Sequence, residues 1–414
     1  LHRSPSGLIS YILLLRYSLD HDETILKSID RPQVLTNENH LILENNCIYQ
    51  LNVIPDKNSR KSRVDSLASV IDGTSSSLGK RLLFHRILNP ITNVSELNSR
   101  YNIVEEFVQD DLWKEFEPYL KIIFDIERLQ RKISLGRIHP SEFYNLNSSY
   151  EAIQKIFGIF HKLSDETKGA LIPQEGLYDK FVKFMEYYHS IYEIDEMMRW
   201  NTTLIGSNIF KSGIYTEIDE IWNEICDINL FFDTIPVSLS GYIDKGGAIV
   251  VKHEHNDRYG HYFCLTKKRS ETLKQNLALA IKPIQYNDII IKSNEFIYKY
   301  QGQKCRLSSK EISKKSDRLI LLMDRLHRIS LECYTDSLHK LSERWSSLFN
   351  PLVDMVSKVD LYKSSAKISI YNGYCKPEIV EEGYGYLDAK DIRHPIIEKI
   401  NTDTEYITND ISIG

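Results

Sequence analysis

The sequence predicts a mainly α-helical protein with an inserted β-rich module, because both the apolar spacing and the placement of glycine and proline indicate this architecture. Isoleucine and phenylalanine recur at helical spacing from Ile214 to Phe232, the pattern of a helix that packs against a partner. The segment from Ser308 to Asn350 contains neither proline nor glycine, so we predict a second long helix there. The residues between these segments carry glycines and short alternating apolar runs, which are typical of strands and turns.

The composition allows more than one core and gives no global sign of nucleic-acid binding. The chain has 414 residues, of which 42% are hydrophobic, whereas single cores stop growing at roughly 250 to 300 residues. It has 52 basic and 57 acidic residues and a formal net charge of -5, so any contact with nucleic acid must come from a local basic patch. The six cysteines are dispersed without a Cys-x-x-Cys pair, which fits neither a disulfide framework nor a zinc site and predicts an intracellular protein.

The first half of the chain is predicted to be an all-helical body. Its apolar residues recur at intervals of three and four in several segments, which is the spacing of one buried helix face. Ser66 is expected to cap the first of these helices, and Pro90 follows its end. In chain order we predict a short strand pair around residues 41–53, a helix from 65 to about 88, a helix starting just after 118 and a helix from 140 towards 160.

The second half is predicted to be two long helices around the β-rich insert. The first has its apolar residues spaced by 4, 3, 4, 3 and 4, at Ile214, Ile218, Ile221, Ile225, Ile228 and Phe232. At about 1.5 Å per residue, the partner helix at 308–350 would be roughly 60 Å long, and its apolar seam shifts phase at Cys333. Within the insert we predict strands at 248–251 and 259–265, held far from the main body. After residue 374, turns precede a strand at 411–413.

Some segments resemble ligand sites but are interpreted as ordinary structure. The phosphate loop GxxxxGK[ST] needs four residues between its glycines and a hydroxyl after its lysine, whereas five residues separate Gly73 from Gly79 and Arg81 follows Lys80. We therefore interpret this segment as a helix with its neighbouring turn. The segment 253–257 holds His, Glu and Asp side chains without a second ligand pair at metal-site spacing, so we predict a solvated hairpin tip.

The segment from Ser66 to Leu83 closely resembles the S-L-x-x-x-L-D-x-T-x-T-x-x-G-x-R-L-L signature of the MutS core domain. Further matches follow in the order that this family has them, at Asn89–Pro90, Arg100–Phe107, Asp125–Leu129 with Ile133 and Pro140, Tyr259–Phe263, and Arg393–Pro395. They extend over nearly the whole chain, with a β insert where the family has its clamp. By this resemblance the chain is identified as a divergent member of the MutS family of DNA mismatch-repair proteins.

The resemblance implies a helical core, long antiparallel lever helices that carry a small β clamp, and the first strands of a C-terminal ATPase domain. We expect the core at 1–213, the outgoing lever helix at 214–235, the clamp at 236–307, the returning lever helix and further core at 308–373, and the start of the ATPase domain at 374–414. The chain begins with Leu1 and ends in an apolar alternation. We therefore expect an internal fragment that stops short of the ATP-binding loop.

The β-rich insert supplies the local basic patch that the net charge lacks. The candidate DNA-binding residues are Lys267, Lys268, Arg269, Lys274, Lys292, Ser293, Asn294, Lys299, Lys304 and Arg306. By the resemblance, Lys292, Ser293 and Asn294 fall where the family's clamp touches DNA. Such cations are expected to contact phosphates and to position the protein without reading bases. A merely solvated basic surface is the alternative interpretation.

Near the end of the chain, Tyr406-Ile407-Thr408-Asn409 resembles the family's F-I-x-N segment, whose aromatic ring stacks on adenine. The candidate cofactor-binding residues are therefore Tyr406, Ile407 and Asn409, with ATP and Mg as cofactors of the intact parent protein. No Gly-rich loop followed by Lys and Ser or Thr occurs in the sequence, so we assign no catalytic residue and no metal ligand. The parent is expected to be a DNA-dependent ATPase, and this fragment to be inactive.

The leading hypothesis is the DNA-binding portion of a MutS-like mismatch-repair ATPase that encircles duplex DNA and contacts its backbone through the clamp. Double-stranded DNA is the expected partner, within a homo- or heterodimer that downstream repair factors join. The alternatives are a MutS paralogue that acts on junctions or recombination intermediates, and a coiled-coil scaffold whose β module binds protein. No apolar run reaches the roughly 20 residues that span a bilayer, so we expect no membrane partner. Nucleus, cytoplasm, organelle and virus-infected cell remain open as intracellular locations.

Overall fold

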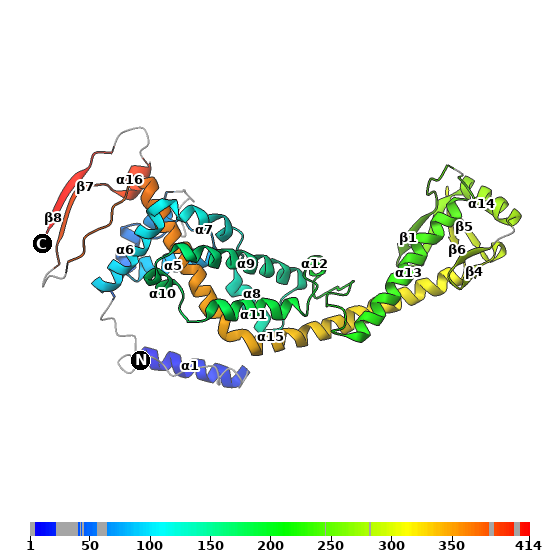
Figure 1. Ribbon diagram of the computed structural model, residues 1–414, viewed down its shortest axis with the longest axis horizontal. Coiled ribbons are helices and arrows are strands. Elements are labelled where there is room, and N and C mark those ends of the chain that lie inside the picture. Colours follow the sequence, from blue (N-terminus) through cyan, green and yellow to red (C-terminus); the bar gives the residue numbers. More distant parts are fainter. Residues whose placement is uncertain are drawn as a thin grey trace. The chain divides into compact units, whose positions relative to one another are not determined.

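The computed structural model describes residues 5–21, 40–41, 43, 45–55, 64–244, 246–280, 283–380, 385–400 and 406–414 (Figure 1). The chain divides into two compact units: unit 1 is Leu1–Pro118 with Ser357–Gly414, and unit 2 is Tyr119–Val356. The predicted fold class is confirmed, since helices dominate and small antiparallel sheets are inserted among them. Among the described residues, no helix is both long and apolar enough to pass through a membrane.

Unit 1 combines short helices, the C-terminal part of helix α15 (Lys310–Asn372) and an antiparallel pair of strands. Its other elements are α1 (Pro5–His21), α3 (Asn45–Gln50), α4 (Leu67–Ile71), α5 (Ser77–Leu88), α6 (Val94–Val108), η2 (Gln109–Asp111), α7 (Trp113–Leu120), β7 (Leu387–Ile392), α16 (Pro395–Ile400) and β8 (Asn409–Ile413). In its core, Phe107 stacks on Phe116 with ring centroids 5.1 Å apart and also meets Tyr362 of α15, which anchors α6 and α7 to that helix. The strand predicted at 411–413 is confirmed.

The strand pair predicted at 41–53 is wrong, because α3 occupies residues 45–50 in the middle of that segment. The backbone after α3 serves the next helix instead of a strand partner. The carbonyls of Asn52 and Val53 accept the N–H groups of Leu67 and Ala68, at 2.8 and 3.0 Å. Those N–H groups belong to the first turn of α4, and the N–H groups of a first turn have no acceptor inside their own helix.

The helix predicted just after Pro118 is also wrong in its bounds. Pro118 lies inside α7, and a separate helix, α8 (Ile126–Ser134), follows. The new start is explained by Asp125, whose carboxylate accepts the Arg128 N–H at 3.3 Å and so caps α8.

The helix predicted at 65–88 is divided into α4 and α5, because a buried carboxylate binds the residues between them. Ser66 caps α4 as predicted, accepting the N–H of the third residue after it at 3.2 Å. Asp360 of α15 accepts the N–H groups of Ser75 and Ser76 at 2.9 and 2.7 Å, and the Ser76 hydroxyl at 2.6 Å. These bonds hold Ser76 in extended backbone, from which it caps α5.

Inside unit 1 the Asp360 carboxylate is neutralised by Lys363, one turn further along α15. Their charged atoms lie 3.0 Å apart and both side chains are fully buried. Lys363 also donates to the Gly73 carbonyl at 2.9 Å and to the Ser75 hydroxyl at 2.7 Å. Burial lowers the pKa of Lys363, and the Asp360 charge opposes this shift. Protein groups therefore occupy the backbone that resembles a phosphate loop, which supports its interpretation as a helix with its turn.

The helical part of unit 2 is built around buried aromatic rings. Its helices are α8, α9 (Pro140–Ile159), η3 (Phe160–Lys162), α10 (Asp165–Leu171), α11 (Leu177–His189) and α12 (Ile194–Met197). Tyr150 of α9 packs edge to face on Phe184 of α11, with ring centroids 5.3 Å apart. Phe143 of α9 packs likewise on Tyr192, which in turn contacts Tyr334 of α15, so aromatic contacts tie these helices to α15. The helix predicted from 140 towards 160 is confirmed.

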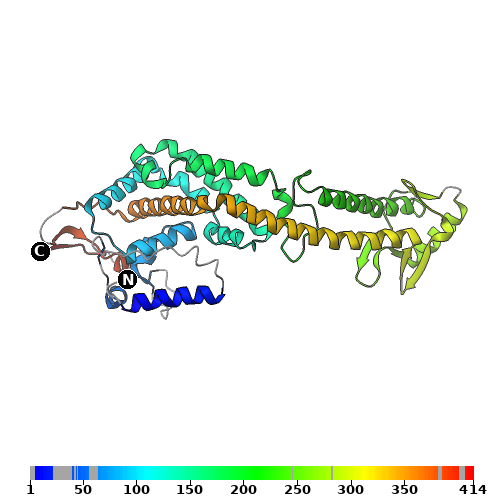
Figure 2. The ribbon, with the colours of Figure 1, turned by 90° about the horizontal axis from the view of Figure 1, so that it is seen from below.

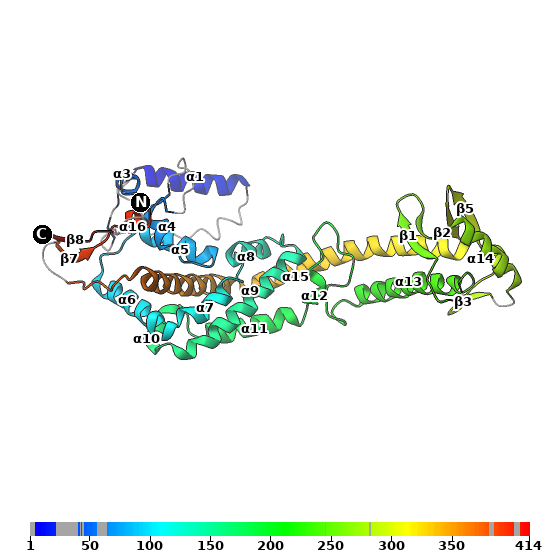
Figure 3. The same ribbon diagram turned by 90° about the horizontal axis from the view of Figure 1, so that it is seen from above.

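Helices α13 (Thr216–Ser240) and α15 lie side by side in unit 2 (Figure 2 and Figure 3). Ion pairs between them join Arg325 to Glu217 at 2.5 Å, Arg318 to Glu224 at 2.6 Å and Lys315 to Asp227 at 3.7 Å. As the residue number rises along α13 it falls along α15, which is the register of an antiparallel pair. The predicted seam is buried from Ile218 to Phe232, whereas Ile214 precedes the helix and is 43% exposed.

Both long helices pass the ends predicted for them. α13 continues through the buried Pro236, and α15 continues through Pro351 to Asn372. Proline in a helix interior costs about 3 kcal/mol or more, so the packing of the flanking turns outweighs the local preference. At about 1.5 Å per residue α15 is about 95 Å long, rather than the roughly 60 Å expected. Its seam shifts phase as predicted, because burial passes from Leu326 to Tyr334 while Cys333 is only half-buried.

Between α13 and α15 lies an insert, residues 252–308, which we call the β module. Its strands and helices are β1 (Lys252–Asn256), β2 (Gly260–Thr266), α14 (Lys267–Leu279), β3 (Ile284–Tyr286), β4 (Ile289–Ile291), η4 (Ser293–Glu295), β5 (Ile297–Gln301) and β6 (Lys304–Ser308). The main sheet is antiparallel with the order β1-β2-β6-β5, and β3 and β4 form a separate hairpin. Figure 1 shows the β module at one end of the α13–α15 pair and α9 and α11 towards the other.

Of the strands predicted in this insert, 259–265 matches β2 and 248–251 is wrong. The N–H groups of Val250 and Val251 both donate to the Ser240 hydroxyl, each at 3.0 Å. This segment therefore binds the end of α13 instead of pairing with a strand. The boundaries predicted between core, lever helices and clamp stay predictions.

Candidate nucleic-acid interface

The sheet of the β module has two chemically different faces, which follow from its strand register. We call outer the face that carries Lys252, Glu254, Asn256, Tyr262, Cys264, Thr266, Lys299, Gln301, Lys304 and Arg306, because cross-strand partners share a face. The opposite, inner face carries Phe263, Leu265, Cys305 and Leu307, all of which are buried. The inner face is thus the core side of the β module, and the outer face is available to a ligand.

The predicted cations Lys267, Lys268 and Arg269, which we call the α14 cations, form the first turn of α14. Thr266 caps this helix by accepting the Arg269 N–H at 3.4 Å. The Lys267 N–H donates to the Gln303 carbonyl at 2.9 Å, so the turn lies against the connection between β5 and β6. All three side chains are exposed, and the first turn holds no acidic residue. Within the described part of the chain, none of them has an ion-pair partner.

Helix α14 packs on the inner face of the sheet. Leu273, Leu277 and Ser270 are buried, and α14 contacts β2 and β6. Lys274 is exposed and lies over the ring of Tyr298, with its ammonium 5.9 Å from the ring centroid. Lys274 therefore belongs to the inner side of the module.

The predicted cations Lys299, Lys304 and Arg306 lie together on the outer face. Lys299 and Arg306 are direct cross-strand partners, and Lys304 pairs with Glu254 at 3.6 Å. With tyrosines and neighbouring polar side chains, they line a hollow of about 280 Å³. The Arg306 guanidinium lies on the ring of Tyr259, 3.6 Å from its centroid, which fixes its orientation.

The remaining predicted residues, Lys292, Ser293 and Asn294, stand apart from the hollow. They lie at the start of η4, between β4 and β5, and their side chains are exposed. The Lys292 N–H donates to the Glu295 carboxylate at 3.2 Å. The structure thus distributes the predicted set over the first turn of α14, the inner side at Lys274, the outer face and η4, rather than bringing it to a single patch.

Sequence reasoning missed α14 and the tyrosines of the outer hollow. The signals for α14 were present, because Thr266 is a capping residue and Leu273 and Leu277 stand at helical spacing without an intervening glycine or proline. Tyr259 was considered only within the predicted strand 259–265 and the family resemblance. No local pattern indicates that Tyr259 contacts Arg306. Tyr259 lies in the turn before β2 and Arg306 lies in β6, and the pairing of these two strands brings the residues together.

The segment 253–257 is not the solvated hairpin tip that we predicted, because 253–256 form part of β1. His253 stacks on Phe232 of α13, and its Nε2 lies 2.9 Å from Nδ1 of His261. The ring of His255 is 4.4 Å from that of His261. The imidazoles therefore pack where the β module joins the long helices, and among the described residues no metal-binding group of three is found.

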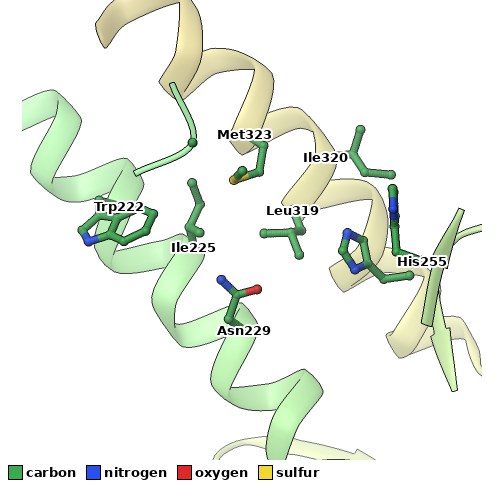
Figure 4. A pocket seen from close by; sticks show the side chains of 9 residues that line it. Trp222, Ile225, Asn229, His255, Leu319, Ile320 and Met323 are labelled. Atoms are coloured by element: carbon green, nitrogen blue, oxygen red, sulfur yellow. The ribbon is translucent and has the colours of Figure 1, made fainter. Parts of the chain in front are cut away.

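A cavity of about 390 Å³ opens beside these histidines (Figure 4). Its lining comes from α13, α15, β1, β2 and one further residue: Trp222, Ile225, Asn229, Leu319, Ile320, Met323, His255, His261 and Gly206. Next to it, the His261 N–H donates to the Ser316 hydroxyl of α15 at 2.8 Å. Gly260 has φ +64 and leaves no room for a Cβ against the same hydroxyl, so the β1–β2 turn is held closely on α15.

Acidification is expected to weaken this junction. Burial and the charges of His255 and His253 lower the pKa of His261 to about 4, below the 6.5 or so of an unfolded histidine. The unfolded state then binds more protons between about pH 6.5 and pH 4, so stability should fall as pH falls through that window. The Asp233 carboxylate of α13 acts in the opposite direction on His253, whose pKa it raises. Urea unfolding at a series of pH values should show a shallower pH dependence for His261→Gln than for the wild type. An unchanged dependence would contradict this role of His261.

The candidate cofactor residues lie in unit 1, where Tyr406 and Ile407 precede β8 and Asn409 is its first residue. Tyr406 is half-buried, Ile407 is 83% exposed, and the Asn409 amide donates to the Ile407 carbonyl at 3.3 Å. The Thr408 hydroxyl donates to Asp391 at 2.8 Å. The Tyr406 ring could stack on a base, but the sequence offers no glycine-rich loop with Lys and Ser or Thr for the phosphates. A complete nucleotide site is therefore not formed by these residues.

Comparison with known proteins gives a consistent result along the chain. The sequence model of the family MutS domain III matches residues 46–366. A DNA mismatch repair mutS homologue from Acanthamoeba polyphaga mimivirus is 30% identical over 432 residues, covering 100% of this chain and 38% of that protein. The mitochondrial DNA mismatch repair mutS homologue of Sarcophyton glaucum is 25% identical, and DNA mismatch repair protein MutS of Clostridioides difficile 24%; they cover 99% and 98% of this chain. The chain spans 40% of each of these two relatives.

Proposed function

Because this chain belongs to the MutS family of DNA mismatch-repair proteins, we propose that it is the DNA-binding portion of a mismatch-repair ATPase. In this proposal the parent protein encircles duplex DNA, and the β module contacts the DNA backbone. The printed names of the relatives refer to DNA mismatch repair, which supports DNA as the ligand. The substrate and partners of the longer protein are part of the proposal.

The observation that carries this proposal is the position of the α14 cations. Lys267, Lys268 and Arg269 are exposed in the first turn of a 13-residue helix that has no acid in that turn. The start of a helix is already the positive end of its dipole, so these charges stand where cations are disfavoured in the free protein. The negative charge of a DNA phosphate would offset this repulsion. It would also interact favourably with the positive end of the helix dipole.

We further propose that ATP with Mg binds the parent protein as its cofactor and that the parent acts as a homo- or heterodimer. The family resemblance of Tyr406, Ile407 and Asn409 supports the adenine contact. The charge pattern of the β module supports contact with phosphates, and no described feature of it indicates base recognition in the grooves. The chain alone should therefore not prefer a mismatched duplex.

The duplex itself provides the test of this function. We expect the chain to bind a matched and a mismatched duplex with equal affinity in fluorescence anisotropy, and this affinity to fall steeply as salt is raised. A salt-independent affinity for a protein partner, without DNA binding, would instead favour the scaffold alternative. A clear preference for the mismatched duplex would contradict the proposal that the chain contacts only the DNA backbone.

The chain is expected to show no ATP turnover. Asp360 accepts hydrogen bonds from the N–H groups of Ser75 and Ser76, and Lys80 pairs with Asp72 at 2.8 Å. In the segment that resembles a phosphate loop, these groups are therefore not free to bind a phosphate. Phosphate release by the purified chain, measured with ATP and Mg, should equal the buffer background. Turnover that disappears in Lys80→Ala would contradict this interpretation.

A further inference from the structure

We propose that the outer face of the β module binds an unpaired nucleotide of a single-stranded DNA segment, separately from the duplex contact assigned to the α14 cations. This inference rests on the proposed function, because it takes the β module to be the nucleic-acid-binding part of the chain. Its site is the hollow of about 280 Å³, in which Arg306 and Lys299 would receive the phosphate. Tyr259 and Tyr262 would provide aromatic surface for the base.

Arg306 is held in place before any ligand arrives. Its guanidinium lies 3.6 Å from the ring centroid of Tyr259 and 5.8 Å from that of Tyr262. The Tyr262 ring is itself fixed, because its hydroxyl accepts the Asn256 amide at 2.9 Å and donates to Glu254 at 3.4 Å. In the described part of the chain, no acceptor or carboxylate pairs with the Arg306 guanidinium. The N–H donors of the planar guanidinium are thus free for an anion that accepts two parallel hydrogen bonds, as two oxygens of a phosphate group can.

The charges next to Arg306 favour an anion. Lys299 stands directly opposite Arg306 across the β5–β6 pair, on the same face, and like charges in that position repel each other. The acid of this face, Glu254, lies on β1 and pairs with Lys304 at 3.6 Å. It therefore neutralises a neighbouring cation and leaves the Lys299 and Arg306 pair in excess. A bound phosphate would turn this repulsion into two charge-assisted contacts.

The shape of the hollow favours a flexible strand over a duplex. Arg306 is half-buried, whereas the α14 cations are exposed, so a ligand must bring its phosphate into the hollow. A single strand can do so and can stack its base on an aromatic ring, and Tyr259 is 43% exposed. Because α14 packs on the inner face, this hollow and the body of α14 lie on opposite sides of the sheet. The module can therefore present separate surfaces to a duplex and to an unpaired strand.

The test compares a labelled oligothymidylate with a labelled matched duplex, both bound by the full chain in fluorescence anisotropy. Arg306→Ala, Tyr259→Ala and Lys299→Ala should each weaken oligothymidylate binding, the first two by about fivefold or more, and weaken duplex binding by a smaller factor. Tyr259→Phe keeps the ring and should bind as the wild type does. Lys180→Ala, an exposed lysine of α11, is the charge-matched control. Lys299 is exposed on an edge strand, so its variant should fold even if Arg306→Ala does not.

The outcomes separate this inference from the proposed function. Duplex binding without any oligothymidylate binding would overturn the inference and leave the proposed function standing. Oligothymidylate binding that is insensitive to Lys299 and Tyr259 but lost with the α14 cations would also overturn it, because one surface would then serve both ligands. If the wild type binds neither probe, the proposed function is overturned as well.

Discussion

Replacing Asp360 with alanine is expected to cost unit 1 about 3–5 kcal/mol of unfolding free energy, the range for breaking a buried ion pair by removing one partner. Lys363 would be left as a buried charge that donates to the Gly73 carbonyl and the Ser75 hydroxyl but has lost its carboxylate partner. The N–H groups of Ser75 and Ser76 would lose their acceptor as well. The connection between α4 and α5 should therefore open, and α5 should lose its attachment to α15.

A matched control stands on the same helix. Asp336 pairs with Lys340 at 2.6 Å, but the two side chains are 58% and 63% exposed, so Asp336→Ala should cost far less than the loss of the buried pair. Thermal unfolding of both variants, with amide hydrogen exchange of residues 73–83, distinguishes the two cases. Equal unfolding temperatures for the two variants, with exchange of 73–83 still slow, would show that the buried pair does not hold this region.

The elements that were predicted well are those whose signal lies within one segment. The seam of α13 and the capping serine of α4 each follow from residues a few positions apart. The division between α4 and α5 could not be predicted in this way, because its cause is Asp360, nearly 300 positions along the chain. The full length of α15 was missed because Pro351 was treated as an end, whereas packing carries the helix through it.

The candidate site shows the same limit. The basic residues of the β module were recognisable from composition, yet their grouping depends on strand register and on α14. Lys299 and Arg306 share a face only because β5 and β6 pair in the observed register, and a shift by one residue would separate them. Tyr259 acquires its role from the same pairing. Residue types therefore predicted the chemistry, and the fold was needed to assign each residue to a surface.

The second large effect is expected at the α14 cations. Replacing Lys267, Lys268 and Arg269 together by alanine should weaken duplex binding at low salt, because up to three phosphate contacts would be lost. Each such contact contributes about 0.9 to the slope of log affinity against log salt, so the slope should flatten by as much as about 2.7. These side chains are exposed and pair with no acid among the described residues, so their removal should leave the fold intact.

The control must remove the same charge from the same unit. Lys132 is unsuitable as a control because it forms an ion pair with Glu142. A suitable control replaces three exposed lysines of unit 2, Lys155 of α9 and Lys180 and Lys183 of α11. Replacing these by alanine changes the net charge by the same amount as replacing the α14 cations. This control removes the general effect of net charge on DNA affinity from the comparison.

The most direct test of the proposed DNA contact is therefore the duplex affinity of three proteins, measured across a series of salt concentrations. The wild type and the control variant with Lys155, Lys180 and Lys183 replaced should show the same steep slope of log affinity against log salt. The variant without the α14 cations should bind more weakly at low salt and show a clearly shallower slope. If that variant keeps both the affinity and the slope of the wild type, the β module does not contact the DNA backbone through α14.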